Sequence, residues 1–331
     1  MKLVTFSYKT IAGEHQRIGA LLNGLIVDLN LGYTSLLFES GNTGRPYEVS
    51  RGLIPLDMLE FLKGGKLSKN AADEVVTFAS ERITKNQTLK GPEGEKVIFT
   101  MDEVNLKAPV PRPNSIRDTM SFEGHMRNFE KITGKPAPPV WFKRPAYYKG
   151  NPCTVIGPDE PVIWPSNTEK LDYELEFGIY IGKEGKNIPA NKAQEYIAGY
   201  TVFNDISARD VLKDDVSTFL GPGKGKDIDT GNITGPCLVT ADELDISDLH
   251  MEARINGEIW STGRTSDMYW KFPQIIEWIS QSETIYPGDF IGSGTPVNGC
   301  GDELDRWIQP GDIVEIEVEG IGVLRNKIIK S

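Results

Sequence analysis

Cysteine is scarce in this chain. The 331 residues contain three cysteines, Cys153, Cys237 and Cys300, which are odd in number and widely spaced. This pattern argues against a disulfide framework and favours a reducing compartment. Histidine is equally rare, with three residues, and no cysteine stands close to a histidine in the sequence. The sequence therefore does not predict a zinc site.

The chain also has fewer positive than negative charges and lacks long apolar runs. Lysine and arginine number 36 against 47 acidic residues, and the net charge is -11. This balance argues against nucleic acid or an anionic membrane as a partner. Residues 1–7 lack the apolar core of a secretion signal, and no run approaches membrane-spanning length. We therefore expect a cytoplasmic protein.

The remaining composition is that of a globular protein, with 39% hydrophobic and 25% charged residues. Its length is enough for two domains. We predict strands at 2–8 and 17–28, helices at 56–67, 71–82, 190–198 and 272–282, and a polar connector at 85–96. Residues 1–105 would form a smaller N-terminal α+β domain, and residues 106–331 a β-rich α+β domain.

Carboxylates gather in two neighbouring segments of the larger domain. Glu174 and Glu176 are two residues apart in a strand-like run, and Asp205 ends the apolar run of residues 198–204. Side chains two apart on a strand point the same way, so these three carboxylates could converge on Mg²⁺, Mn²⁺ or Ca²⁺. The run Glu315, Glu317, Glu319 has the same spacing and is typical of a solvent-facing strand side. Spacing alone therefore leaves both interpretations open.

Four ordered blocks resemble the fumarylacetoacetate hydrolase family. They are LDYELEFGIYIG at 171–182, AGYTVFNDISARD at 198–210, PGDFIGSGTP at 287–296 and PGD at 310–312. The resemblance covers the chain from about residue 105 onward. It implies a mixed β-roll catalytic domain, which in this family usually forms a homodimer. It also implies that Glu174, Glu176 and Asp205 are metal ligands.

A further cluster occupies residues 115–126. Phe122, Met126 and Phe129 recur at helical spacing, which predicts a short helix starting near Asp118. Asp118 could simply cap that helix, and His125 could be a surface histidine or one with satisfied hydrogen bonds. On a continuous helix, however, a separation of seven residues places both on one face. The family resemblance implies that Asp118 is the fourth metal ligand and that His125 is the general base.

The glycine-rich segment 221–231 is not a phosphate-binding loop. Leu220 stands where that loop requires glycine, and Asp227 follows Lys226 in place of serine or threonine. A flexible turn would explain the segment. The resemblance instead implies that Lys226 and Thr230 face the substrate, and that Arg209 and Lys226 together stabilise a departing carbanion. Leu212 replaces a family glutamine, which leaves the exact substrate open.

The resemblance implies two more substrate-binding residues, Tyr148 and Thr295, although ordinary packing and turn chemistry would also explain them. It leaves the acidic partner of His125 open among Asp302, Glu303 and Glu123.

The implied function is hydrolysis of a carbon–carbon bond in a 2,4-dioxo acid of the acylpyruvate or fumarylacetoacetate type. The expected cofactor is Mg²⁺, with Mn²⁺ or Ca²⁺ as alternatives, and the expected partner is a small 2-oxo or β-diketo acid. One alternative is a decarboxylase or isomerase of a 2-oxo or 2-hydroxydienoic acid in aromatic catabolism. Another is a β-rich binding protein without catalytic activity.

Overall fold

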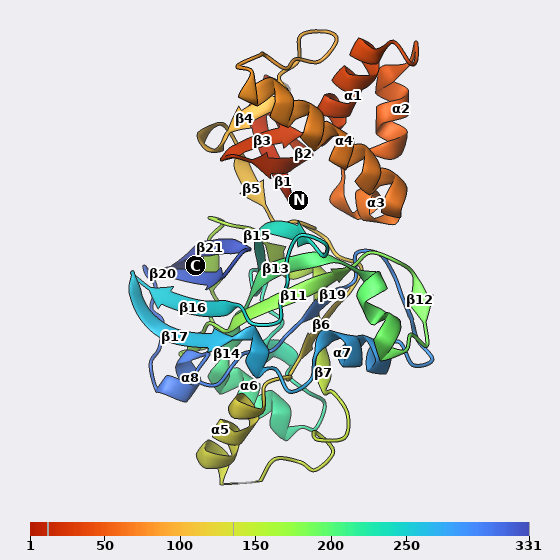
Figure 1. The fold of residues 1–331 in the computed structure, drawn as a ribbon. Coiled ribbons are helices and arrows are strands. Elements are labelled where there is room, and N and C mark those ends of the chain that lie inside the picture. The colour runs from red at the N-terminus through yellow and green to blue at the C-terminus, as the bar shows by residue number, and fades with distance from the viewer. Residues whose placement is uncertain (12, 135, 331) are drawn as a thin grey trace.

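The computed structural model describes residues 1–11, 13–134 and 136–330. Strands dominate the larger part of the molecule, and a smaller N-terminal part combines strands with a layer of helices (Figure 1). This is the β-rich α+β class expected from the sequence. Within the described residues, none of the helices combines the length and apolar character that crossing a membrane requires.

The N-terminal part begins with an antiparallel strand meander followed by helices. The predicted strand at 17–28 is two strands, because Asn23 and Gly24 both take positive φ, of 53° and 79°, at a tight hairpin turn. The Asp28 side chain then caps the first helix by accepting from the Leu31 amide. The elements are β1 (Lys2–Thr10), β2 (Gly13–Leu22), β3 (Leu25–Asp28), α1 (Leu29–Ser40), α2 (Pro46–Leu53), α3 (Met58–Lys63), α4 (Gly65–Thr84), β4 (Ile98–Thr100), η1 (Met101–Glu103) and β5 (Asn105–Lys107).

The helices α3 and α4 correspond to the two periodic segments expected here, whereas α1 and α2 were not predicted. In α1 the residues from Leu29 to Ser35 are all buried, so the first two turns of this helix show no solvent-facing polar side. A helix that is buried on all sides lacks the alternation of apolar and polar residues by which we recognise helices in sequence.

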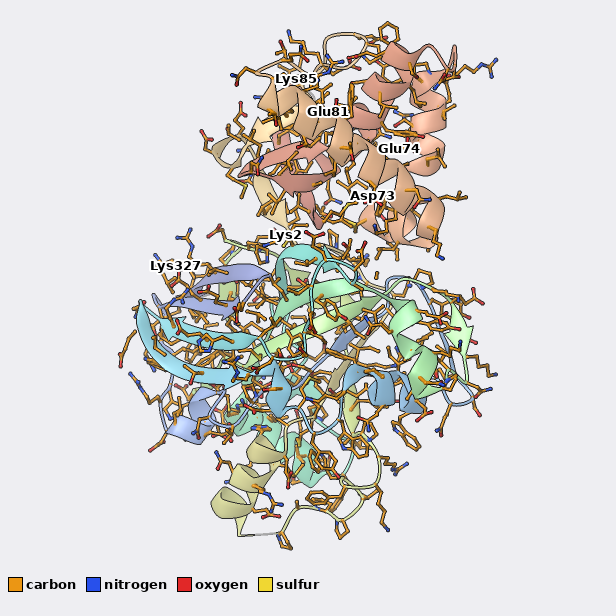
Figure 2. The ribbon with its side chains drawn as sticks, viewed as in Figure 1. Lys2, Asp73, Glu74, Glu81, Lys85 and Lys327 are labelled. Carbon is orange, nitrogen blue, oxygen red and sulfur yellow. The ribbon has the colours of Figure 1, made fainter. Side chains whose placement is uncertain are left out.

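One long sheet extends from the N-terminal part into the larger part. Its strand order is β4-β3-β2-β1-β15-β13-β11-β19-β6-β7, with β5 paired to β1 and β8 paired to β15. Lys2 of β1 lies where the two parts meet, and its Nζ donates to the Ile321 carbonyl at 3.2 Å (Figure 2). The additional strands are β6 (Ile116–Thr119), β7 (Tyr147–Gly150), β8 (Val155–Ile156), β11 (Leu175–Ile181), β13 (Ile197–Asp205), β15 (Asn232–Thr240) and β19 (Phe290–Gly292).

A second sheet has the order β17-β16-β20-β21-β9 and packs against the first. Val202 of the long sheet and Ala253 and Ile316 of the second sheet belong to one buried apolar cluster. The strands of the second sheet are β9 (Val162–Trp164), β16 (His250–Ile255), β17 (Glu258–Arg264), β20 (Ile313–Val318) and β21 (Gly322–Lys330). Two small ladders pair β10 (Leu171–Asp172) with β14 (Ser207–Ala208) and β12 (Gly185–Lys186) with β18 (Thr284–Ile285).

The prediction that a helix starts near Asp118 is wrong. Asp118 lies on strand β6 and pairs in register with Gly292 of the parallel strand β19, and helix α5 (Glu123–Thr133) begins only after a break. Asp118 is therefore no helix cap, and it does not share a helix face with His125. The apolar spacing of Phe122 and Met126 belongs to the start of α5, and the side chain of Phe129 lies outside the described part.

The remaining helices differ in part from expectation. The segment at 190–198 contains a 3₁₀ helix, η3 (Ala190–Tyr196), and the first residues of β13, while the segment at 272–282 contains α7 (Phe272–Ile279). The helices α6 (Arg209–Ser217) and α8 (Gly301–Leu304) were not predicted, and both lie next to site residues. Short 3₁₀ turns complete the chain at η2 (Pro152–Thr154), η4 (Gly223–Gly225) and η5 (Thr265–Asp267). The domain division near residue 105 stays a prediction.

Candidate functional site

Four buried carboxylates meet at the end of neighbouring strands. One oxygen from each of Asp118, Glu174, Glu176 and Asp205 lies within 4.8 Å of the others. Glu174 directly precedes β11, and Glu176 is the second residue of that strand. Asp205 ends β13, and Asp118 is on β6, beyond β19 in the same sheet. The sheet therefore brings together the four residues that the sequence and the family resemblance suggested as metal ligands.

Two glycines, one at the end of β19 and one just after it, leave room for this cluster. A Cβ added at Gly292 would lie 2.4 Å from Asp118 Oδ1. Gly294 has φ of 74°, and its amide donates to Glu176 Oε2 at 2.9 Å. A side chain at Gly294 would both strain the backbone and meet the Thr119 carbonyl at 2.1 Å. Glycine is thus required at positions 292 and 294, where backbone and carboxylates approach closely.

Two buried cations contact the cluster. Lys226 Nζ lies 2.7 Å from Glu174 Oε2 and 2.5 Å from Asp205 Oδ2. Arg209 donates through Nη2 to Glu174 Oε1 at 2.8 Å and through Nε to Asp172 Oδ2 at 2.7 Å. Both residues that the family resemblance identified as anion-stabilising groups are therefore at the site, where they hold side-chain carboxylates.

The carboxylates are not electrically equivalent. Burial and the charge of Asp205 raise the pKa of Asp118 to about 8, and burial and Asp118 raise the pKa of Glu176 well above its ordinary value. Burial would also raise the pKa of Glu174, but Lys226 and Arg209 outweigh it and hold that pKa at about 2. The cluster therefore keeps a proton, or needs a further cation, to offset its crowded negative charge.

The residues fit a hard divalent cation. Within the described part of the chain, the buried oxygens Glu176 Oε1 and Asp205 Oδ1 have no hydrogen-bond partner. Buried polar atoms are rarely left in that state, and a metal ion would satisfy them. The donors are all carboxylate oxygens, which Mg²⁺, Mn²⁺ and Ca²⁺ prefer over the nitrogen and sulfur donors of zinc.

The run Glu315, Glu317, Glu319, which has the same alternating spacing, lies in a different environment. Arg254 contacts both Glu315 and Glu317, at 3.3 and 2.8 Å, and all three side chains are partly exposed. Glu319 accepts from the His250 amide. Identical alternation thus produces a solvent-facing strand side in one place and a carboxylate cluster in the other.

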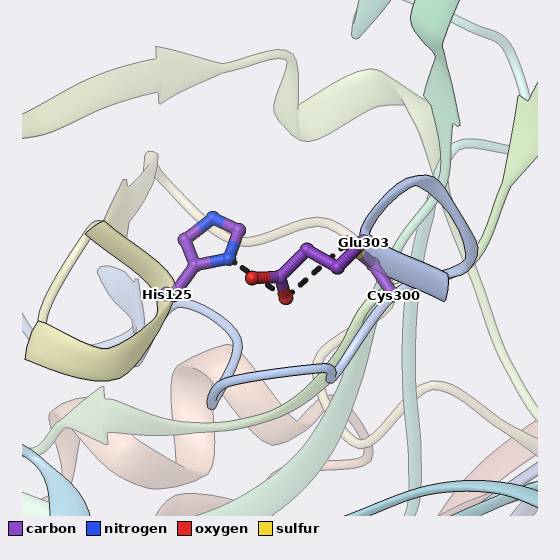
Figure 3. A group of neighbouring side chains, drawn as sticks. All are labelled: His125, Cys300 and Glu303. Carbon is purple, nitrogen blue, oxygen red and sulfur yellow. Dashed lines mark hydrogen bonds and ion pairs between the residues drawn. The ribbon is translucent and has the colours of Figure 1, made fainter. Parts of the chain in front are cut away.

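His125 has a buried acidic partner. Its Nδ1 lies 3.1 Å from Glu303 Oε2, with side-chain exposures of 6% and 1% (Figure 3). Glu123 instead pairs with Arg127, and Glu303 is the candidate that contacts the imidazole. His125 also lowers the pKa of Glu174, after the larger effects of burial, Lys226 and Arg209. The imidazole is therefore within electrostatic reach of the cluster.

The three expected substrate-binding residues differ from one another in what their hydroxyl groups contact. Tyr148 donates its hydroxyl to Asp205 Oδ2 at 2.6 Å. Thr295 is buried next to Gly294, and among the described residues its Oγ1 meets no hydrogen-bond partner. Thr230 Oγ1 accepts from the Ile163 amide at 2.9 Å, so its hydroxyl oxygen is engaged in a hydrogen bond within the fold.

Asp172 is a site residue that the sequence reasoning missed. It is fully buried and accepts from Arg209 Nε, from the Gly301 amide at 2.8 Å and from the Asp302 amide at 3.1 Å. It thereby ties Arg209 to the short helix α8 that carries Glu303. The available signal was its place two residues before Glu174, on the same side of the alternating segment.

Comparisons with known proteins agree with this architecture. Residues 114–329 match the family described as "Fumarylacetoacetate (FAA) hydrolase C-terminal". The mitochondrial oxaloacetate tautomerase FAHD2A of Bos taurus is 30% identical over 334 residues, covering 99% of this chain and 92% of that protein.

Two solved structures superpose over nearly the whole length. A "probable 2-hydroxyhepta-2,4-diene-1,7-dioate isomerase" from Mycobacterium abscessus has a TM-score of 0.69 at 25% identity, covering 100% of this chain and 99% of that chain. The fumarylacetoacetate hydrolase of Exiguobacterium antarcticum has a TM-score of 0.69 at 24% identity, covering 99% and 100%, and shows the shared fold. On the family match and the full-length relative, this chain belongs to the fumarylacetoacetate hydrolase family.

Proposed function

We propose that this chain is a metal-dependent hydrolase that cleaves a carbon–carbon bond in a 2,4-dioxo acid of the acylpyruvate or fumarylacetoacetate type. The observation that carries this proposal is the buried pair of His125 and Glu303 within electrostatic reach of the four-carboxylate cluster. An oriented imidazole is the usual means of activating water. The carboxylate cluster suits a cation that binds a 2-oxo acid.

Asp118, Glu174, Glu176 and Asp205 would hold the cation, with Mg²⁺ as the first choice and Mn²⁺ or Ca²⁺ as alternatives. When bound, the cation supplies Lewis acidity that polarises the 2-oxo group. The neutral imidazole of His125 would keep its proton on Nδ1, which lies 3.1 Å from Glu303 Oε2. Nε2 is then the acceptor for a proton from water.

Water that loses its proton to His125 would attack the distal carbonyl carbon. The bond from that carbon to its neighbouring methylene then breaks, and the electron pair leaves with the pyruvate-like half as an enolate. Lys226 and Arg209 place fixed positive charge at the cluster, where stabilising the enolate requires little reorganisation. The proton held by His125 returns to the methylene carbon, which balances the reaction.

Tyr148 and Thr295 would orient the substrate. The Tyr148 hydroxyl already contacts a cluster carboxylate, and the buried Thr295 hydroxyl has a free hydrogen-bonding capacity among the described residues. We propose a substrate contact for Thr230 on the family resemblance alone, since its hydroxyl is engaged with Ile163.

A second candidate function is proton transfer without cleavage. The Bos taurus relative is named an oxaloacetate tautomerase, and the Mycobacterium abscessus neighbour is named an isomerase of a dienedioate. In this reaction His125 would move a proton between carbon and oxygen of an enol, and no water would be added. Decarboxylation of a 2-oxo acid would use the same electron sink without a base.

A substrate panel in ¹⁸O-labelled water separates these reactions. Protein loaded with Mg²⁺ would be tested on acetylpyruvate, fumarylpyruvate, fumarylacetoacetate and oxaloacetate. The hydrolase consumes a dioxo acid and places one ¹⁸O in the released carboxylate, whereas a tautomerase changes the enol absorbance of oxaloacetate without consuming it. Fast tautomerisation of oxaloacetate without consumption of any dioxo acid would contradict the hydrolase proposal and support proton transfer without cleavage.

We also propose that the protein forms a homodimer, because members of this family usually pair through the catalytic domain. We further propose a cytoplasmic location, because the three widely spaced cysteines favour a reducing compartment.

A further inference from the structure

A second group of metal-binding side chains lies beside the carboxylate cluster. One ligand atom from each of His125, Cys300 and Glu303 lies within 4.8 Å of the other two. The Glu303 carboxylate lies between the imidazole and the thiol, 3.1 Å from Nδ1 and 3.8 Å from Sγ (Figure 3). Cys300 and His125 are far apart in the sequence, which therefore did not predict this group, and the fold brings them together.

This group has the features of a built site. His125, Cys300 and the Glu303 side chain are each no more than 6% exposed. Within the described residues, Glu303 Oε1 is buried and has no hydrogen-bond partner. A buried carboxylate oxygen without a partner is costly, and a cation is one way to satisfy it.

We propose that His125, Cys300 and Glu303 form a second metal site, selective for a thiophilic divalent cation such as Zn²⁺. Nitrogen, sulfur and oxygen donors from three residues match the ligand number of zinc sites that keep one position for water or another ligand. The Cys300 thiol would release its proton to solvent as its sulfur binds the ion. A thiolate and a carboxylate then balance the two positive charges.

The two sites select cations by donor type. The four-carboxylate cluster offers oxygen ligands, which Mg²⁺ prefers, and Mg²⁺ has little affinity for thiolate or imidazole. Zn²⁺ at the second site would compete for the imidazole that the proposed hydrolysis needs as a base. Resting on that proposed function, the site makes the enzyme sensitive to inhibition by zinc.

Cobalt absorption tests the site without turnover. Full-length protein is titrated with Co²⁺ in excess Mg²⁺, because a thiolate ligand to Co²⁺ produces a near-ultraviolet charge-transfer band. We expect a band that saturates at one equivalent and is removed by Zn²⁺. Cys300→Ser should abolish it, whereas the matched controls Cys153→Ser and Cys237→Ser should keep it, since those thiols lie outside the group. No band in the wild type, or a band that survives in Cys300→Ser, overturns the site.

Turnover supplies a second measurement. With saturating Mg²⁺, Cys300→Ser should require at least about tenfold more Zn²⁺ for half-inhibition than the wild type. Equal zinc sensitivity contradicts the regulatory role. Thermal melting checks the fold of Cys300→Ser. If Cys300→Ser misfolds, Glu303→Gln is used instead, and it should also lose the cobalt band. A cobalt band without hydrolysis of any dioxo acid supports the site and removes the proposed function, while hydrolysis without the band does the reverse.

Discussion

Asp118 is the carboxylate whose protonation should control metal binding. Its pKa is raised to about 8 by burial and by Asp205, so below that pH a cation must displace a proton. The apparent affinity for Mg²⁺ should rise with pH, up to about pH 8, by about tenfold per unit for each proton displaced. Calorimetry at pH 6, 7 and 8 measures both the affinity and the protons released. An affinity independent of pH would contradict the ligand role of Asp118.

The same shift predicts a stability effect with a definite sign. A carboxyl group whose folded pKa lies above its ordinary value of 3.8 stabilises the metal-free protein at low pH, and this contribution is lost as pH rises through about 8. Bound Mg²⁺ should remove that loss. The increase in melting temperature caused by Mg²⁺ should therefore be larger at pH 8 than at pH 5.

Glu176→Gln tests the cluster directly. The change removes one ligand charge from a fully buried position and should abolish Mg²⁺ binding and metal-dependent turnover while leaving the fold intact. Glu317→Gln on β20 is the matched control, since it occupies the same kind of alternating position outside the cluster. Calorimetry and turnover would be compared for both. Normal metal affinity and turnover in Glu176→Gln would remove this site assignment.

His125→Ala tests the proposed base. Loss of acid–base catalysis should lower turnover of a dioxo acid by roughly 100-fold or more, with Mg²⁺ affinity nearly unchanged. Decarboxylation of oxaloacetate, if present, should decrease less because it needs no activated water. Glu303→Gln should also slow hydrolysis, since Glu303 orients the imidazole. Small and equal losses in both reactions would mean that His125 has a packing role only.

At the scale of elements, the site depends on strands β6, β19, β11 and β13 lying side by side. Strand β19 carries none of the four cluster carboxylates but lies between the strands of Asp118 and Glu176 and sets their spacing. Its last residue, Gly292, faces Asp118 across the parallel ladder. A strand that carries no cluster carboxylate is thus as necessary to the site as the strands that carry them.

Gly292→Ala tests this spacing. The added methyl group would lie 2.4 Å from Asp118 Oδ1 and 3.0 Å from the Phe203 ring, so the carboxylate has to move. Overpacking of this kind costs about 1–3 kcal/mol, which would lower metal affinity by about ten- to a hundredfold or reduce stability by that amount. Gly52→Ala is the control, because a Cβ there meets no described atom within 4 Å. Unchanged affinity and melting temperature in Gly292→Ala would contradict the constraint.

At the scale of the whole molecule, we predict a homodimer. Phe219 and Leu220, which follow helix α6, are 97% and 94% exposed in the single chain. Exposed apolar side chains of this size are common at protein interfaces, and pairing would cover them. Sedimentation velocity at micromolar concentration should show twice the chain mass of 36.7 kDa. A monomer under those conditions would refute the prediction.

The fold and family could largely be predicted from the sequence, and both are confirmed. The four motif blocks lie on contiguous segments, and two of them contain Glu174, Glu176 and Asp205 together with their strands. Alternation on a strand is a local property, so one segment is enough to show which side chains share a side. The β-rich class and the amphipathic helices α3 and α4 follow from the same kind of local pattern.

The contacts of the site were decided by tertiary structure. Strand pairing, and not helix periodicity, places Asp118 beside Glu176, and the fold selects Glu303 as the partner of His125 over the nearer Glu123. It also brings Cys300 to His125, and Asp172 to Arg209 and α8. These residues are separated by tens to more than a hundred positions. Local periodicity carries no information about such pairs, because their proximity results from sheet order and from burial of apolar side chains throughout the chain.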